Sequence, residues 1–235
     1  DPTAWLRADR ADVHYELLDH SDRVLADHLG TTPDRSVALL GPTAVPETLD
    51  LLGRLGAEHL VVSADHLDPR PVTASHGSTH PARLIDGGGE AQTALVADPD
   101  LARHLIDPQG AVSAAQFLLA DLALLAWTDP TVTRSAVVTT PPGLPVDGDT
   151  LHLVMGALRD APFLRVRPLP DLFDDMQGFD AAAAVTYELW PEPIVPVERR
   201  ATDRSLAETA VAAYTAMLGG PHPDAASLHD LLEVT

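Results

Sequence analysis

The sequence predicts an α/β protein with a parallel sheet, and three observations support this class. Short apolar runs alternate with helical patterns through the first 170 residues. Residues 36–62 form a β-α-β pattern with a short crossover, the connection that builds parallel sheets. The chain has 235 residues, 45% of them hydrophobic, which suits one large domain with its own core. We expect residues 1–170 to form the α/β part and residues 171–235 to add a proline-rich connection and C-terminal helices.

The expected strands are short apolar runs bounded by turn residues. In chain order they are residues 12–16, 36–40, 60–62, 83–85, 93–96, 134–139 and 163–166. The run at 36–40 is continuously apolar, as in a strand covered on both faces. Asp86 to Gly89 form the expected turn between two of the short strands.

The expected helices combine apolar spacing with capping residues. They are residues 21–30, 46–56, 98–105, 112–127, 149–160, 205–218 and 224–232. Gly30 and Gly56 are the expected stops, Pro46 opens the second helix, and Asp98 is the expected N-cap of the third. Between the helices, residues 168–200 hold five prolines and are expected to be extended or irregular.

The helix at 112–127 is apolar nearly all round, so we expect it to be central and buried. Its most apolar stretch, residues 117–127, is short and contains Asp121. A bilayer span needs about 20 apolar residues, so the sequence predicts no membrane span.

The charge of the chain excludes several partners. The formal net charge is −20, all basic residues are Arg, and the acidity is spread over both halves. Such a surface repels phosphate backbones and anionic membranes, so we expect no nucleic-acid partner. The lack of Cys excludes disulfides, thiolate metal sites and a Cys nucleophile. The absence of Lys indicates a GC-rich genome, and the start at Asp1 is typical of a fragment or a processed chain.

Ligands of parallel α/β proteins bind at the carboxyl ends of the strands. By this rule Glu16, Asp65 and His66 are the ligand-cleft candidates, and Asp19 lies near the first of them. A carboxylate beside an imidazole could hold a metal or shuttle a proton. The alternative is that Asp65 stabilises a turn.

His76 and His80 have the i, i+4 spacing of a two-histidine metal site on a helix. Gly77 between them and Pro81 after them oppose a helix, and the alternative is a solvated loop. A divalent metal is therefore the one cofactor considered, and no other is expected. Phosphate-loop, nucleophile-elbow and H-E-x-x-H motifs are absent from the sequence.

Several segments together resemble a known family. Residues 41–63, from Gly-Pro-Thr-Ala-Val-Pro to Leu-Val-Val-Ser, resemble the strand-helix-strand block of a large actinobacterial cell-envelope family of unknown function encoded near the lipid II flippase. Residues 115–126, 134–142 and 161–164 are similar to that family's long helix, its following strand and its next helix end. The resemblance covers about residues 35–170.

This resemblance implies an extracytoplasmic, membrane-tethered protein with further domains beyond this chain. It also implies a partial (β/α) barrel that resembles polysaccharide deacetylases and related glycoside hydrolases. Such deacetylases carry a Thr-Phe-Asp-Asp-Gly-Pro motif and a later His-x-x-x-His pair. His76 and His80 match the pair, but no Asp-Asp motif precedes them, so no catalytic residue carries over.

Two functions follow from these observations. The first is a non-catalytic or degenerate carbohydrate-enzyme-like module that binds or scaffolds in the cell envelope, with envelope glycan or another envelope protein as partner. The alternative is a metal-dependent deacetylase or glycoside hydrolase on envelope glycan that uses Asp65, His66, His76 and His80.

Overall fold

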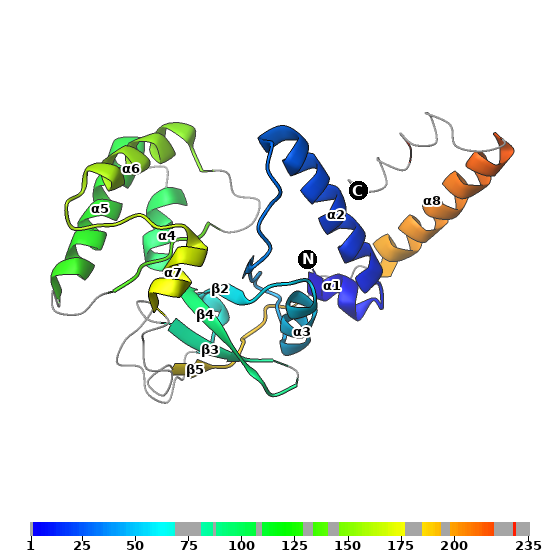
Figure 1. Ribbon diagram of the computed structural model, residues 1–235, viewed down its shortest axis with the longest axis horizontal. Helices are drawn as coiled ribbons and strands as arrows, with labels where there is room; N and C mark the ends of the chain where they lie inside the picture. Colours follow the sequence, from blue (N-terminus) through cyan, green and yellow to red (C-terminus); the bar gives the residue numbers. More distant parts are fainter. Residues whose placement is uncertain are drawn as a thin grey trace. The chain divides into compact units, whose positions relative to one another are not determined.

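The computed structural model describes residues 2–68, 81–86, 88–106, 110–128, 134–140, 146–176, 185–193, 198–218 and 228. Within them the chain is α/β, with a five-stranded mixed sheet and eight α-helices (Figure 1). Contacts between residues divide the chain into two compact units, residues 1–34 with 193–235 and residues 35–192. The sheet belongs to the second unit. The division at residue 170, drawn from composition, stays a prediction.

The sheet has the strand order β1-β2-β4-β3-β5. Its strands are β1 (Val37–Leu39), β2 (His59–Ser63), β3 (Pro81–Ile85), β4 (Ala91–Ala97) and β5 (Val185–Tyr187). β1, β2 and β4 are parallel neighbours, β3 and β4 form an antiparallel hairpin, and β5 runs parallel to β3. The predicted β-α-β unit is confirmed, with α3 (Pro46–Arg54) as the crossover helix. The described strands form an open, mixed sheet that is not closed into a barrel, and the expected partial (β/α) barrel stays a prediction.

Side chains of β2 alternate between the two faces of the sheet, as strand geometry requires. Leu60 and Val62 pack in the cluster that α3 covers, and Val61 packs on the other side with Phe173. All three β2 residues are fully buried. β1 lies at the sheet edge, where Leu39 is 55% exposed. The cover on both faces that was predicted for the run at 36–40 is therefore wrong for β1, whereas β2 has it.

Two of the strands predicted in the second unit are not formed. Residues 134–140 meet the sheet at a single bridge, between Val137 and Ala97 at the end of β4. Residues 163–166 lie in irregular backbone after α6 (Gly148–Asp160). The reason is packing, because Val138 and Leu164 contact a helical cluster instead of extending the sheet. Short apolar runs of this kind do not distinguish a strand from an extended connection.

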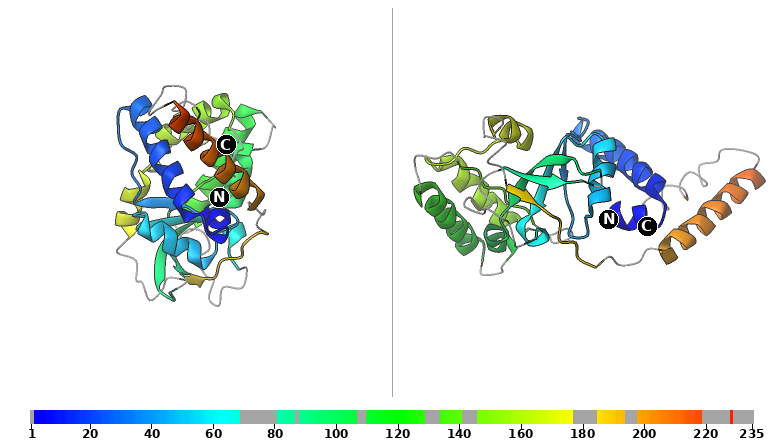
Figure 2. Two further views of the ribbon diagram at one scale, coloured as in Figure 1. Left: turned by 90° about the vertical axis from the view of Figure 1, so that its right-hand side faces the viewer. Right: turned by 90° about the horizontal axis from the view of Figure 1, so that it is seen from below.

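Three helices form a layer of their own in the second unit (Figures 1 and 2). They are α4 (Pro99–Ile106), α5 (Ala111–Thr128) and α6. Leu101 of α4, Leu118 of α5 and Val154 of α6 meet in one buried cluster. Both views show α5 and α6 side by side. These helices confirm the elements predicted at 98–105, 112–127 and 149–160.

α5 is less buried than its composition predicts. One face is buried, formed by Ala114, Ala115, Leu118 and Leu122. The other face exposes Phe117, Leu124 and Trp127, so the prediction of a central, enclosed helix is wrong. Among the described helices, α5 is long and apolar enough to cross a membrane. Core helices of soluble proteins can have the same length and composition. The absence of a membrane span stays a prediction.

The proline-rich part is more ordered than predicted. It contains α7 (Leu169–Met176) and β5, where an irregular connection was expected. Pro170 lies in the first turn of α7, a position that tolerates proline because no backbone donor is needed there. Phe173 of this helix is 3% exposed and packs on the sheet. This long-range contact explains why α7 forms.

The first unit holds α1 (Pro2–Arg7), α2 (Ala11–Leu29) and α8 (Glu198–Met217). The predicted strand at 12–16 is wrong, because these residues form the first turns of α2. Val13 is fully buried, and Leu17 follows four residues later. This spacing places both side chains on one face of a helix, and it is equally compatible with one face of a strand. α2 ends at Gly30 with φ 68°, as predicted. α8 confirms the helix at 205–218, and the helix expected at 224–232 lies outside the described residues apart from residue 228.

Candidate functional site

The carboxyl ends of the parallel strands meet at one edge of the sheet. The register pairs Ser63, the last residue of β2, with Ala97, the last residue of β4. Asp65 and His66 follow the first of these strands, and Asp98 follows the second. Open α/β sheets bind ligands at this edge because variable loops gather there on a rigid scaffold. The structure therefore places two predicted site residues, Asp65 and His66, at the predicted edge.

Asp65 and His66 belong to the 3-10 turn η1 (Ala64–His66). The turn is fixed by the backbone, because Trp190 N donates a hydrogen bond to His66 O at 2.8 Å. Asp65 is exposed and His66 is half-buried. The Nδ1 atom of His66 is buried, and none of the described residues hydrogen-bonds to it. A buried ring nitrogen usually has a partner, so His66 is the residue of this edge best suited to meet a ligand.

Asp98 is occupied by a structural role. Its Oδ1 accepts hydrogen bonds from Asp100 N at 2.9 Å and Leu101 N at 3.3 Å. These donors are free backbone groups of the first turn of α4, so Asp98 is the predicted N-cap. Its own N–H donates to Val137 O at 3.0 Å. The carboxylate that follows β4 therefore caps α4 and is not available to a ligand through Oδ1.

The expected metal site is incomplete in the part of the chain that the structure describes. No three His, Asp or Glu side chains come together there as metal ligands. Asp65 and His66 therefore have no described third ligand beside them. His76 and His80 fall in residues 69–80, outside the described residues. A metal site that joins the four residues stays a prediction.

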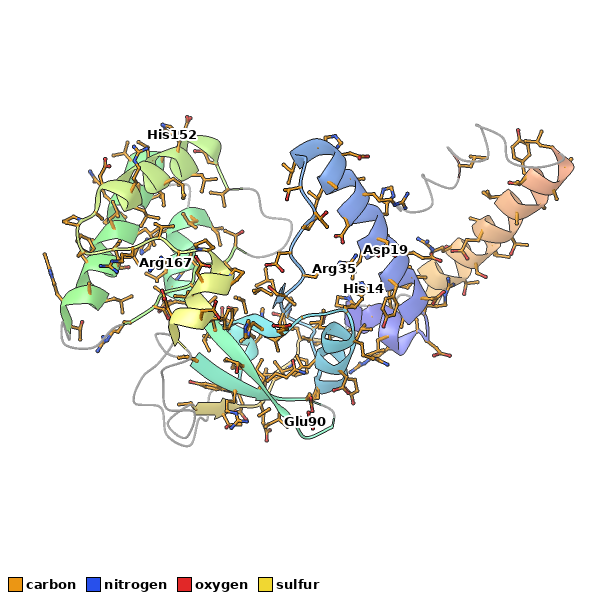
Figure 3. All side chains as sticks on the ribbon, viewed as in Figure 1. His14, Asp19, Arg35, Glu90, His152 and Arg167 are labelled. Carbon is orange, nitrogen blue, oxygen red and sulfur yellow. The ribbon has the colours of Figure 1, made fainter. Side chains whose placement is uncertain are left out.

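Glu16 lies in the first unit, on α2 and not at a strand end. Its Oε2 accepts a hydrogen bond from Arg204 Nη2 of α8 at 3.2 Å. Arg204 also reaches Glu208 at 2.8 Å, and its side chain is 9% exposed. A largely buried guanidinium between two carboxylates ties α2 to α8. Asp19 and His14 lie on the same helix as Glu16 (Figure 3).

The start of α2 carries two groups with shifted pKa values. Arg10 Nε donates a hydrogen bond to Asp12 at 3.1 Å, and this bond lowers the pKa of the carboxyl below its ordinary range. Burial of His14 lowers the pKa of its imidazole, because the charged form loses hydration. The start of α2 therefore combines a charge pair with a histidine whose neutral form is favoured.

A second polar pair was missed at the level of sequence. His104 Nε2 of α4 lies 2.7 Å from Asp121 Oδ2 of α5, and the Phe117 ring is 6.0 Å from the imidazole. A carboxylate that orients an imidazole is one part of an acid-base site. The available signal was Asp121 itself, a lone charge inside an apolar helix. We assign the pair a structural role, because it joins two helices that pack together.

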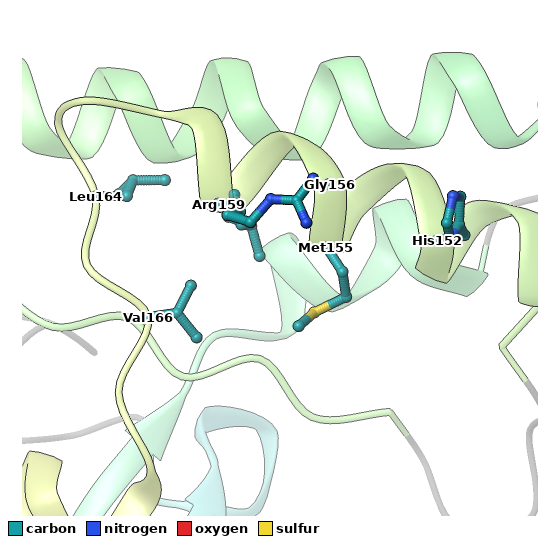
Figure 4. Close-up of a pocket in the computed structure, with 7 residues that line it drawn as sticks. His152, Met155, Gly156, Arg159, Leu164 and Val166 are labelled. Carbon is teal, nitrogen blue, oxygen red and sulfur yellow. The ribbon is translucent and has the colours of Figure 1, made fainter.

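A groove of about 570 Å³ runs along α6 (Figure 4). One wall of the groove is α6, which contributes the basic side chains of His152 and Arg159 among small and apolar residues. The other wall is the irregular segment after α6. The lining residues are His152, Met155, Gly156, Leu158, Arg159, Leu164 and Val166. Figure 3 labels His152 on α6 and Arg167 in the irregular segment between α6 and α7. The volume is in the range of ligand sites, and no sequence pattern pointed to it.

Comparisons with known proteins give no identification. No family model matches the chain, and no curated protein matches it at a significant level. The candidate sites therefore rest on the geometry of the sheet edge and of the α6 groove.

Proposed function

We propose that this chain is a non-catalytic binding or scaffolding module of the bacterial cell envelope. Its sheet would be that of a degenerate carbohydrate-acting enzyme, and the helical layer of the same unit would present the binding surface. The groove along α6 is the observation that carries the proposal. It joins an apolar floor to two basic side chains in a chain of net charge −20.

The lining of the groove favours a peptide over a glycan. Met155, Leu158, Leu164 and Val166 offer aliphatic surface. Glycans bring many hydroxyl groups that need hydrogen-bond partners, which such a floor lacks. His152 and Arg159 at the groove attract carboxylates. Of the two predicted partners, an acidic and apolar segment of another envelope protein therefore fits better.

The envelope location and the barrel-like ancestry are part of the proposal. β1, β2 and β4 are parallel neighbours in ascending chain order, and the β3/β4 hairpin interrupts this order on the far side of β4. The three parallel strands are the part of the sheet that supports a partial barrel, because (β/α) barrels are built from parallel neighbours in chain order. Cell fractionation of the tagged full-length protein tests the location, because recovery in the cytoplasmic fraction would contradict it.

Photo-crosslinking in living cells tests the binding proposal. A photoreactive amino acid replaces Met155 in the groove or, as a control, Met217, which is 85% exposed on α8. We expect one discrete protein adduct from position 155, none from position 217, and loss of the adduct with Arg159→Glu. Arg103→Glu is the matched control, because Arg103 is also an exposed helical arginine beside an aspartate. Arg159-dependent sedimentation with peptidoglycan, without an adduct, would overturn the peptide assignment.

His66 favours the alternative, a metal-dependent deacetylase or hydrolase. Its buried Nδ1 lies at the carboxyl edge of the parallel strands, where open α/β sheets bind ligands, and Asp65 is adjacent. Metal titration followed by elemental analysis tests this function. Stoichiometric Zn²⁺, Co²⁺ or Ni²⁺ that is lost with His66→Ala and kept with His28→Ala would support it. His28 is an exposed histidine of α2. No bound metal in the purified protein or after titration would reject it.

A further inference from the structure

The exposed face of α5 carries a continuous line of uncharged side chains. We call this line the α5 stripe, formed by Ser113, Phe117, Ala120, Leu124 and Trp127. The steps of four, three, four and three residues place them along one side of the helix. Phe117 is 51% exposed, Leu124 66% and Trp127 71%. Ala120 is also exposed, and Ser113 is half-buried. The buried face of the helix lies on the opposite side.

The α5 stripe is unusual for this chain, in which 21% of residues are charged. Asp121, the one charged residue of α5, lies beside the stripe and is paired with His104. Trp127 also contacts Phe163, with ring centroids 6.2 Å apart, so apolar surface continues past the helix. Exposed apolar patches of this kind mark interaction surfaces.

We propose that the α5 stripe binds the α5 stripe of a second copy of this chain in an antiparallel, two-fold contact. A two-fold axis at Ala120 places Ala120 against its copy. Phe117 then faces Leu124 of the second copy, and Ser113 faces Trp127. Each small residue meets a larger or equally small one, so two identical stripes are complementary in this register.

Charge favours a second copy over a lipid surface. Two chains of net charge −20 repel each other wherever their acidic residues meet, and the five stripe residues carry no charge. Asp121, beside the stripe, is paired with His104 of its own chain. α5 has no Arg or Lys that would draw it to anionic lipid headgroups. The stripe is about 21 Å long at 1.5 Å per residue. A single helix pair of this size belongs to the weak end of specific interfaces, so the dimer should depend on concentration.

Sedimentation velocity over a concentration series is the first test. We expect the wild-type chain to shift from monomer to dimer as concentration rises. Leu124→Glu should weaken the association by roughly tenfold or more, the effect of losing an interface anchor. Leu206→Glu on α8 is the matched control, because Leu206 is also 66% exposed, and it should leave the association unchanged. A wild-type chain that stays monomeric, or equal effects of the two variants, would overturn the proposal.

Cysteine crosslinking tests the register, because the chain has no native Cys. Ala120→Cys should form disulfide dimers well above the level of Ser21→Cys, an exposed control on α2. Phe117→Cys and Leu124→Cys chains should crosslink when mixed and much less when separate. Crosslinking of Phe117→Cys with itself at the level of the mixture would reject the antiparallel contact. Trp127-dependent binding of the monomer to phosphatidylcholine vesicles, without dimers, would identify lipid as the occupant and overturn the proposal.

Discussion

The imidazole Nε2 of His104 lies 2.7 Å from the carboxylate Oδ2 of Asp121, and this contact joins α4 to the middle of α5. Asp121 is the one charged residue of an 18-residue helix. A carboxylate among apolar side chains needs a hydrogen-bond partner, because its loss of hydration is costly. His104 supplies that partner and so helps to set how α4 packs on α5.

Removal of this pair should destabilise the second unit. Asp121→Ala should lower the free energy of unfolding by about 1 kcal/mol, the usual worth of one such bond. The two side chains are 24% and 49% exposed, so we expect no larger effect. Urea unfolding of the single variants and of His104→Ala/Asp121→Ala gives the coupling between them. Additive effects would show that the contact contributes nothing.

The fold could be predicted where its signals are local. The crossover helix from Pro46 and the cap at Asp98 both follow from neighbouring residues, and both are confirmed. α7 could not be predicted, because Phe173 is held by Val61 and Leu95, which lie far away in the sequence. Proline content favoured an irregular segment there, and tertiary packing overrode it.

The candidate site residues likewise fall into those that topology predicts and those that depend on tertiary packing. Asp65 and His66 could be placed at the sheet edge, because a parallel topology fixes where strand ends meet. The pair of His104 and Asp121 spans 17 residues and depends on how two helices pack, which spacing does not reveal. The pattern at residues 12–16 predicts a strand that ends at Glu16, whereas the residue lies on α2.

Loss of the cap at Asp98 should weaken α4. Asp98→Ala leaves two backbone donors of the first helical turn without their acceptor. We expect the free energy of unfolding to fall by about 1 kcal/mol, and Asp98→Ser to restore most of it. Asp100→Ala, in the same turn, is the control. Equal effects of Asp98→Ala and Asp100→Ala in thermal unfolding would show that the cap has no special role.

Replacement of two glycines by alanine should change the free energy of unfolding in opposite directions. Gly156 lies inside α6, and an added Cβ meets no heavy atom within 4 Å. Gly156→Ala should raise the free energy of unfolding by about 0.5–1 kcal/mol, because alanine loses less backbone entropy in a helix. Gly30 has φ +68°, so Gly30→Ala should lower it by about 1 kcal/mol. Chemical denaturation checks both signs, and a destabilised Gly156→Ala would contradict the open space beside α6.

Phe173 should be the strongest single anchor between α7 and the sheet. Its ring is 3% exposed and stacks on His59 at 4.3 Å between centroids. Phe173→Ala should cost about 3–5 kcal/mol through lost burial and a cavity, and Phe173→Leu markedly less. Hydrogen exchange should show loss of protection in α7 first. If Phe173→Ala lowered the free energy of unfolding by no more than Phe173→Leu does, the ring would not be what holds α7 to the sheet.

His14 should make the first unit sensitive to acid. Burial lowers the pKa of His14 below its ordinary value of 6.5. In the pH window below that value the unfolded chain binds the proton and the folded chain does not, so the free energy of unfolding falls as pH falls. His14→Gln removes this contribution, and its stability should decline less between about pH 7 and about pH 5, the range in which histidines titrate. Urea unfolding at several pH values measures the difference, and an NMR titration of the imidazole gives its pKa. A pKa at or above 6.5 in the folded protein, or equal pH slopes for both chains, would contradict the prediction.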